Sequence, residues 1–164
     1  DIIIVDTGAG ISDSVLECLV ASGEVLLVTT PEPTSITDSY SLLKALYRHP
    51  RFQDDFTKVK MVANRVSNIK EGQVLFDKLN AVVTRYLKIP MTYLGCVPQD
   101  PQVMQAVMQQ VPVSIQNPGA KSSQAYQRIA ERLCEKEEQQ PRRGMAAFFS
   151  HIIGTRNGAM KQPK

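Results

Sequence analysis

The first ten residues, Asp1-Ile-Ile-Ile-Val-Asp-Thr-Gly-Ala-Gly10, predict the fold class of the whole chain. Residues 2–5 are consecutive β-branched residues without polar alternation, a pattern typical of a strand that a parallel sheet buries on both faces. Asp6 ends this run, and the glycines that follow let the backbone pass close to another group. An acid at the carboxyl end of a buried parallel strand lies where open α/β sheets bind ligands. The stretch therefore predicts a ligand-binding strand end or, equally well, an ordinary strand whose Asp caps the next turn.

Strand and helix patterns alternate along the rest of the chain. Further strands are predicted at 24–30, 59–66 and 93–97, and helices at 12–21, 34–47, 71–87, around 103–107 and at 123–138. The second helix should bury Ile36, Tyr40, Leu43 and Tyr47, and the third Val74, Leu75, Leu79, Val82, Val83 and Tyr86. Because no hairpin signal separates the strands, we expect an α/β fold, a mostly parallel sheet with helices on both faces.

In such a sheet the loops that follow the strands converge on one edge. These loops are residues 6–10, 30–35, 64–65 and 98–100, and all of them are polar. Four polar loops at one edge predict a single ligand site. The alternative is that they are only solvated connections.

Size and composition indicate one ordinary globular domain. The chain has 164 residues, of which 43% are hydrophobic and 21% charged. No apolar run approaches the roughly 18 residues of a membrane span. Cys18, Cys96 and Cys134 are odd in number and far apart, which suits a reducing cytoplasm and neither a disulfide framework nor a zinc site. The chain opens inside a predicted strand and without Met, so we expect it to be the C-terminal part of a longer protein.

The C-terminal end differs in charge from the body. The net charge is +3, and after Glu138 there are five basic residues and no acid, which leaves 3 − 5 = −2 for the preceding chain. We expect residues 1–138 to form the folded body, 139–144 a linker, 145–154 an amphipathic helix and 155–164 a basic tail. One apolar stripe of that helix contains Met145, Phe148, Phe149, Ile152 and Ile153. A basic helix with such a stripe suits an anionic membrane surface, or alternatively a contact within the protein or with a partner.

Two nucleotide classes fit the opening loop. Gly8-Ala-Gly10 after a strand, with Glu32 ending the next strand, is a partial dinucleotide fingerprint, but Asp13 replaces its third glycine and would repel a pyrophosphate. A nucleoside triphosphate fits better, because Asp6 can hold Mg²⁺ through water and the glycine-containing loop can respond to a γ-phosphate.

Three segments carry a resemblance to a known family. DIIIVDTGAGIS (1–12), EVLLVTTPEPTSITDSY (24–40) and VANRV (62–66) resemble the MinD/ParA group of dimerising P-loop ATPases, most closely its MinD-like regulators of flagellar number. The resemblance runs to about residue 138 and resumes in the terminal amphipathic segment. It implies ATP and Mg²⁺ as cofactors, with Asp6 as the acid of the Walker B strand and Gly8 and Gly10 in the second switch.

The same resemblance implies roles for three other groups of residues. Asn64 and Arg65 would recognise adenine, and Pro98, Gln99 and Asp100 would pack against the base. Thr37, Asp38 and Ser41 would lie on a surface used for dimer and partner contacts. The family's phosphate-binding loop would precede Asp1, and no G-K-S or G-K-T occurs in the chain. We therefore expect ATP hydrolysis of the intact protein and not of this chain alone.

The resemblance also implies a cellular role. The intact protein would dimerise on ATP, sit reversibly on the anionic inner face of the cytoplasmic membrane, with a cell pole as one candidate location, and control flagellar number and placement. Its implied partners are flagellar switch-complex proteins, a signal-recognition-type GTPase and a flagellar transcription activator, and no sequence-specific DNA binding is expected. The alternatives are a division-site or DNA-partitioning ATPase of the same group and a non-catalytic membrane-tethered interaction module.

Overall fold

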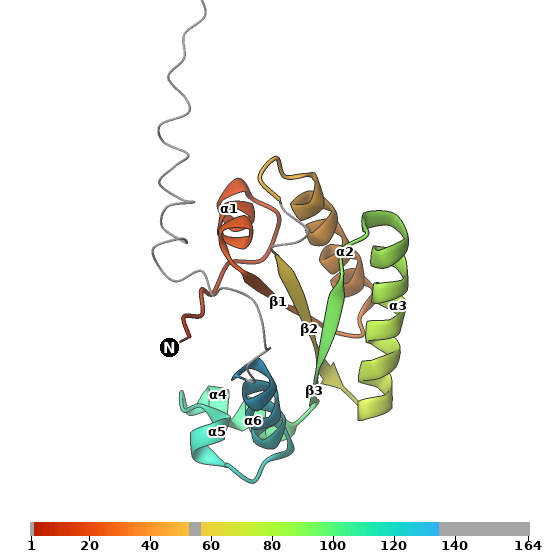
Figure 1. Cartoon of the computed structure of the whole chain (residues 1–164). Coiled ribbons are helices and arrows are strands. Elements are labelled where there is room, and N and C mark those ends of the chain that lie inside the picture. Colours follow the sequence, from red (N-terminus) through yellow and green to blue (C-terminus); the bar gives the residue numbers. More distant parts are fainter. Residues whose placement is uncertain (1, 53–56, 135–164) are drawn as a thin grey trace, which may run out of the picture.

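The computed structural model describes residues 2–52 and 57–134. Helices and strands alternate along the chain, as Figure 1 shows. In order, the elements are α1 (Asp13–Ala21), β1 (Glu24–Thr29), α2 (Pro33–Arg48), β2 (Lys58–Val66), α3 (Ile69–Leu87), β3 (Met91–Pro98), α4 (Pro101–Met108), α5 (Val113–Gln116) and α6 (Lys121–Cys134).

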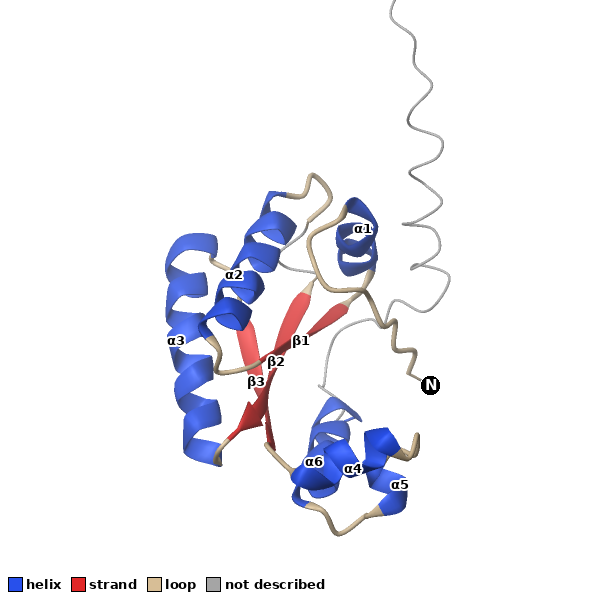
Figure 2. Ribbon diagram, turned by 180° about the vertical axis from the view of Figure 1, so that it is seen from behind, coloured by secondary structure: helices blue, strands red, loops and turns tan. Residues whose placement is uncertain are grey.

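The described strands form one parallel sheet with the order β1-β2-β3. Helices α2 and α3 cover one face, where Leu43 and Leu75 join Val25 and Met61 in the main core. The other face is covered at β2 and β3 by α6, whose Ala125 packs with Val62 and Leu94 (Figure 2). The prediction of an α/β fold with helices on both faces of a parallel sheet is confirmed.

Strand β2 is the centre of this arrangement. It lies between two partners, and its residues 59–63 are all buried. The row includes Lys60, which is only 5% exposed and whose Nζ lies 3.2 Å from a carboxylate oxygen of Glu24 on β1. This strand thus meets both requirements of an interior strand, paired backbone on each side and apolar cover on each face.

The N-terminal run is where the sequence prediction is wrong. Residues 2–5 form no strand, and their side chains are exposed: Ile2 58%, Ile3 63%, Ile4 73% and Val5 47%. Among the described residues, no strand pairs with this run or with the outer edge of β1. A β-branched run becomes an interior strand only where neighbouring strands satisfy its N–H and C=O groups. The sheet of the described residues therefore has three strands, and Asp6 does not end one of them.

Two helices bury a different stripe from the predicted one. In α3, Leu75, Leu79 and Val83 are buried as predicted, whereas Val74, Val82 and Tyr86 are 40%, 41% and 62% exposed. Gly72, Phe76 and Leu87 complete the buried face instead. Phe76 packs against the aromatic ring of Tyr93 on β3, with the ring centroids 5.2 Å apart. Tyr47 of α2 is likewise 43% exposed and not buried.

The remaining elements differ from the predictions mainly in their ends. Helix α5 was not predicted, and α4 spans Pro101–Met108 around the expected residues. The linker 139–144, the amphipathic segment with Met145, Phe148, Phe149, Ile152 and Ile153, and the basic tail 155–164 lie outside the described residues. Within the described part, no helix combines the length and the apolar character that crossing a membrane requires.

Candidate functional site

The carboxyl ends of the parallel strands hold most of the residues predicted to bind a ligand. At the end of β1, Thr29 is buried and its Oγ1 lies 3.1 Å from Oγ of Ser35 in the first turn of α2. The backbone N–H of Thr30 donates to the same Ser35 oxygen at 3.0 Å. These bonds tie the first loop to the start of α2, so the loop has a defined path over the sheet edge.

The loop after β1 meets the end of β2 through an ion pair. Nη1 of Arg65 lies 3.7 Å from a carboxylate oxygen of Glu32. The two side chains are 59% and 48% exposed, so this pair contributes little stability and a ligand can displace it. The pKa of Glu32 is lowered by a hydrogen bond from the Thr30 side chain, by its own backbone and, to a smaller extent, by Arg65.

A local irregularity in β2 sets the positions of Asn64 and Arg65. The pairing with β3 shifts between Asn64 and Val66, and Arg65 has a left-handed backbone with φ of 57°. The Asn64 side-chain oxygen accepts a hydrogen bond from the Arg65 N–H at 3.0 Å. Non-glycine residues in this conformation are uncommon and often lie at functional positions. The bulge exposes Arg65 and leaves Asn64 half-buried beside it.

The loop after β3 is joined to the end of β2 by its backbone. Gln99 donates its N–H to the Val66 carbonyl at 2.8 Å. Gln99 is exposed, and Pro98 and Asp100 are half-buried. The structure therefore brings the predicted nucleotide-binding residues Asn64, Arg65, Pro98, Gln99 and Asp100 to one edge of the sheet.

Asp100 has a structural task within this loop. One carboxylate oxygen accepts from the Gln102 N–H at 3.0 Å and so caps α4. The other accepts from the N–H and the hydroxyl of Ser122 in α6, at 3.0 Å and 2.9 Å. The backbone hydrogen bonds from Ser122 and Gln102 keep the pKa of Asp100 below its ordinary value. The carboxylate thus fixes the loop between two helices, a role that the sequence analysis did not predict.

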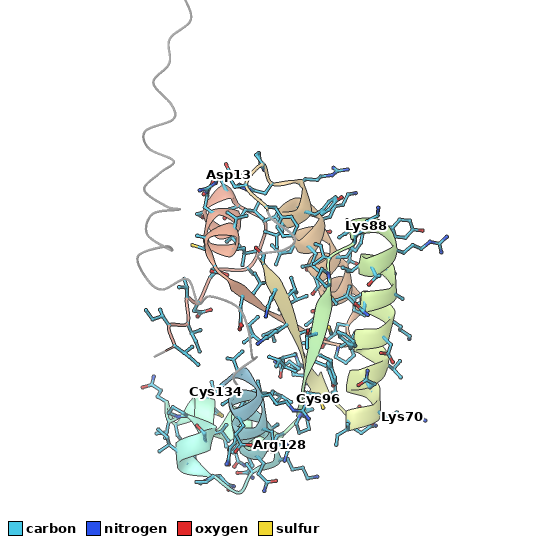
Figure 3. The ribbon with its side chains drawn as sticks, viewed as in Figure 1. Asp13, Lys70, Lys88, Cys96, Arg128 and Cys134 are labelled. Atoms are coloured by element: carbon cyan, nitrogen blue, oxygen red, sulfur yellow. The ribbon has the colours of Figure 1, made fainter. Side chains whose placement is uncertain are left out.

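A groove of about 490 Å³ lies next to this loop. Figure 3 shows Lys70 of α3 and Arg128 of α6 at the same end of the molecule as Cys96. The lining residues include Pro98, three basic side chains and no acid; they are Ser67, Asn68, Ile69, Lys70, Cys96, Pro98, Lys121, Gln124 and Arg128. Asn64 and Arg65 do not line the groove. Its basic residues favour an anionic ligand. Lys70 and Lys121 lie in the first turns of α3 and α6, which could have indicated them from the sequence, whereas Arg128 lies in the middle of α6 and had no such signal.

The residues predicted for metal binding and for the switch lie in the N-terminal segment. Asp6, Gly8 and Gly10 are exposed. The backbone φ of Gly10 is 112°, a value that residues other than glycine rarely adopt. Within the described part of the chain, no group of three or more His, Cys, Asp or Glu side chains could hold a metal ion. A single accessible carboxylate is nevertheless compatible with Mg²⁺, which usually keeps several waters and takes the rest of its ligands from substrate phosphates.

The predicted partner surface lies on the outer side of α2. Thr37 and Asp38 are exposed, whereas Ser41 is half-buried. The hydroxyl of Thr37 donates to the Pro33 carbonyl at 2.9 Å, and that of Ser41 donates to the Thr37 carbonyl at 2.8 Å. Asp38 is therefore the charged side chain that this surface offers to a partner.

Comparisons with known proteins identify relatives of the chain. The chain is 39% identical over 149 residues to the antiactivator FleN of Pseudomonas aeruginosa, which covers 91% of the chain and 52% of FleN. It is 30% identical over 158 residues to the flagellum site-determining protein YlxH of Helicobacter pylori, covering 93% of the chain and 52% of YlxH. The chain spans about half the length of the curated relatives it matches. No protein-family model matches the chain.

Solved structures share the fold. A ParA family ATPase from Chlorobium tepidum aligns with a TM-score of 0.51 and 19% identity, over 72% of this chain and 43% of that one. The cell division ATPase MinD of Pyrococcus furiosus aligns with a TM-score of 0.50 and 21% identity, over 70% of this chain and 43% of that one. The fold class is thus that of the MinD/ParA ATPases. The identities to FleN and YlxH then place the chain in this family, beside these two flagellar proteins.

Proposed function

We propose that the chain is part of an ATP-dependent, dimerising switch that regulates the number and placement of flagella. One observation carries this proposal: the Glu32–Arg65 ion pair and the hydrogen bond from Gln99 to Val66 join three strand-end loops at a single edge of the sheet. Open α/β sheets bind ligands at this edge. The similarity to FleN and YlxH supports the flagellar role.

The residues at the sheet edge and those of the N-terminal segment each have a part in nucleotide binding. The amide of Asn64 and the cation of Arg65 recognise adenine, and Pro98 and Gln99 pack against the base, on a loop that Asp100 holds in place. Asp6 holds Mg²⁺ through water, and Gly8 and Gly10 allow the segment after it to respond to the γ-phosphate. The bound Mg²⁺ would neutralise phosphate charge during hydrolysis in the intact protein.

The nucleotide part of the proposal is tested in the full-length protein. Asn64→Ala removes a polar group beside the base, and we expect Mg-ATP binding to weaken by about tenfold, the size of one lost hydrogen bond to a buried ligand. Asp6→Ala should abolish hydrolysis and leave nucleotide binding largely intact. Thr92→Ala, an exposed position on β3, is the control. Calorimetry and phosphate release measure the two effects, and wild-type behaviour of both variants would overturn the proposed site.

The membrane part of the proposal concerns residues 145–154. A single helix with Met145, Phe148, Phe149, Ile152 and Ile153 on one face binds a bilayer only marginally, and two helices in a dimer bind more tightly through effective concentration. ATP would thereby control residence on the inner face of the cytoplasmic membrane. Co-sedimentation with vesicles containing anionic lipid should be lost in Phe149→Glu and retained in Ser150→Glu. If vesicle binding is unchanged both in Phe149→Glu and when the anionic lipid is left out, the membrane part of the proposal is contradicted.

The partner part of the proposal concerns the surface around Thr37, Asp38 and Ser41. It would contact the second subunit or flagellar proteins such as a switch-complex protein, a signal-recognition-type GTPase or a transcription activator. Asp38 is exposed and can be changed without disturbing the core. This makes Asp38→Ala the appropriate probe of partner binding.

A further inference from the structure

The unit formed by α4 and α5 carries an exposed apolar surface that the proposed function does not use. We define the α4 stripe as Met104, Val107, Met108 and Val111, which are 66%, 65%, 81% and 38% exposed. These positions follow one another at i, i+3, i+4 and i+7, so those within α4 share one side of the helix. Ala106, 2% exposed, faces the other way, into a small cluster with Val113 and Ala120.

Hydrogen bonds hold the helices α4 and α5 in place relative to α6. Asp100 caps α4 through the Gln102 N–H, and Ser123 donates from α6 to the carbonyls of Val113 and Asn117, at 3.1 Å and 2.7 Å. The α4 and α5 helices lie beside α6 at one end of the molecule, away from α2 and α3 (Figure 2). The stripe is thus a preformed, outward-facing surface and not a loosely held segment.

The chemistry of this surface is unusual for an exposed one. Residues 101–120 contain no charged side chain and several glutamines. Exposed apolar side chains grouped in this way mark interaction sites more often than ordinary solvated surface. The absence of charge argues against an anionic membrane or a charged peptide as the occupant, because neither would find a counter-charge here.

We propose that the α4 stripe is a homotypic contact, in which the stripe packs against the same stripe of a second copy of this chain. In a two-fold contact the same patch is used on both copies, so a charge in the patch faces its own like charge nearby. A charge-free patch avoids this repulsion. Amide groups are also self-complementary, since each can both donate and accept; within one chain Gln116 Nε2 donates to Oε1 of Gln109 at 2.6 Å.

The size of the α4 stripe determines how strong the contact is. An eight-residue helix such as α4 is about 12 Å long, whereas a stable interface buries about 800 Å² on each partner. We therefore expect weak, concentration-dependent association that needs no nucleotide. None of the α4 stripe residues belongs to the predicted nucleotide site, so this contact is proposed in addition to the ATP-linked dimer of the proposed function.

The test is sedimentation equilibrium of the chain without nucleotide, at concentrations up to about 1 mM, where weak specific association becomes visible. Wild-type chain should show a reversible monomer–dimer equilibrium. Met108→Lys should weaken it by about tenfold or more, because a charge would be buried in the apolar seam. Gln127→Lys, the same charge change on an exposed part of α6, should leave it unchanged.

A mixing experiment separates self-contact from other occupants. Met108→Lys and Met108→Glu should each be monomeric alone and associate when mixed, since opposite charges then meet across the two-fold seam. Circular dichroism verifies that both variants are folded, as expected for a side chain 81% exposed. A wild-type chain that stays monomeric, an unchanged equilibrium in Met108→Lys, or no recovery on mixing would each overturn the homotypic contact. If the full-length wild-type protein does not dimerise when ATP is added, that result would instead contradict the proposed function.

Discussion

The run at residues 2–5 and residues 59–63 of β2 were both predicted to be buried strands, and only the second segment is one. Both contain β-branched residues, and both lie directly before a polar residue assigned to the predicted site, Asp6 as the acid that holds Mg²⁺ and Asn64 as an adenine contact. In β2, residues 59–63 are buried between β1 and β3, whereas the side chains of residues 2–5 are 47–73% exposed. The comparison teaches that a strand-like sequence forms a strand only where other strands are available to pair with its backbone. Whether such a run becomes an interior strand depends on backbone pairing on both of its sides.

The largest expected effect tests this difference directly. Met61 on β2 is fully buried, so Met61→Ala should lower the free energy of unfolding by about 2–5 kcal/mol through lost contacts and a cavity. Ile3→Ala in the exposed run should change it by no more than about 0.5 kcal/mol. Urea unfolding of the chain measures both. A large loss in Ile3→Ala would show that residues 2–5 are buried in solution.

The second prediction tests how tightly the covered face of the sheet is packed. Alanine normally stabilises a helix relative to glycine, yet a Cβ at Gly72 of α3 would lie 2.6 Å from the Tyr93 hydroxyl and 2.8 Å from Cβ of Cys96. We expect Gly72→Ala to destabilise the chain by about 1–3 kcal/mol through overpacking. Tyr93→Phe removes the hydroxyl, which is buried without a hydrogen-bond partner in the described structure. The double variant should therefore recover part of the loss, and purely additive effects would contradict the packing explanation.

The third prediction concerns the pH dependence of stability and tests Asp100, which holds the loop after β3 in place. The folded-state pKa of Asp100 is lowered by hydrogen bonds from Ser122 and Gln102. Its stabilising contribution is therefore present above the ordinary carboxyl pKa and is lost as the pH falls through the lower, folded value. Asp100→Asn should lower the melting temperature of the chain near neutral pH. The difference in melting temperature between variant and wild type should become smaller in acid. Thermal unfolding between neutral and acidic pH measures this, and a difference that grows toward low pH would reverse the assignment.

The smallest expected effect on stability belongs to the outer side of α2. Asp38 is exposed, so Asp38→Ala should change the free energy of unfolding by no more than about 0.5 kcal/mol. The same variant of the full-length protein should bind its partner more weakly or disturb flagellar number in cells. Thermal unfolding and a count of flagella per cell provide the two measurements. Normal flagellation would exclude Asp38 from the partner surface.

The sequence by itself determined the alternation of elements and the residues that collect at one edge of the sheet. The strand and helix patterns depend on local periodicity, and parallel crossovers send the loops after the strands to the same side, so the loops with Glu32, Asn64, Arg65 and Gln99 could be brought together without a structure. The likeness to a family of ATPases also depended on the sequence alone.

Tertiary structure decided which of these elements are covered. Among the described residues no strand lies beside residues 2–5, and Val74, Val82 and Tyr86 of α3 face outward. Asp100 accepts hydrogen bonds from both α4 and α6. Tertiary structure also exposed the α4 stripe, although Met104, Val107 and Met108 have the spacing of a buried helix face. The physical reason is the same in each case: periodicity says which side chains share a face, but burial depends on what the rest of the chain places against that face.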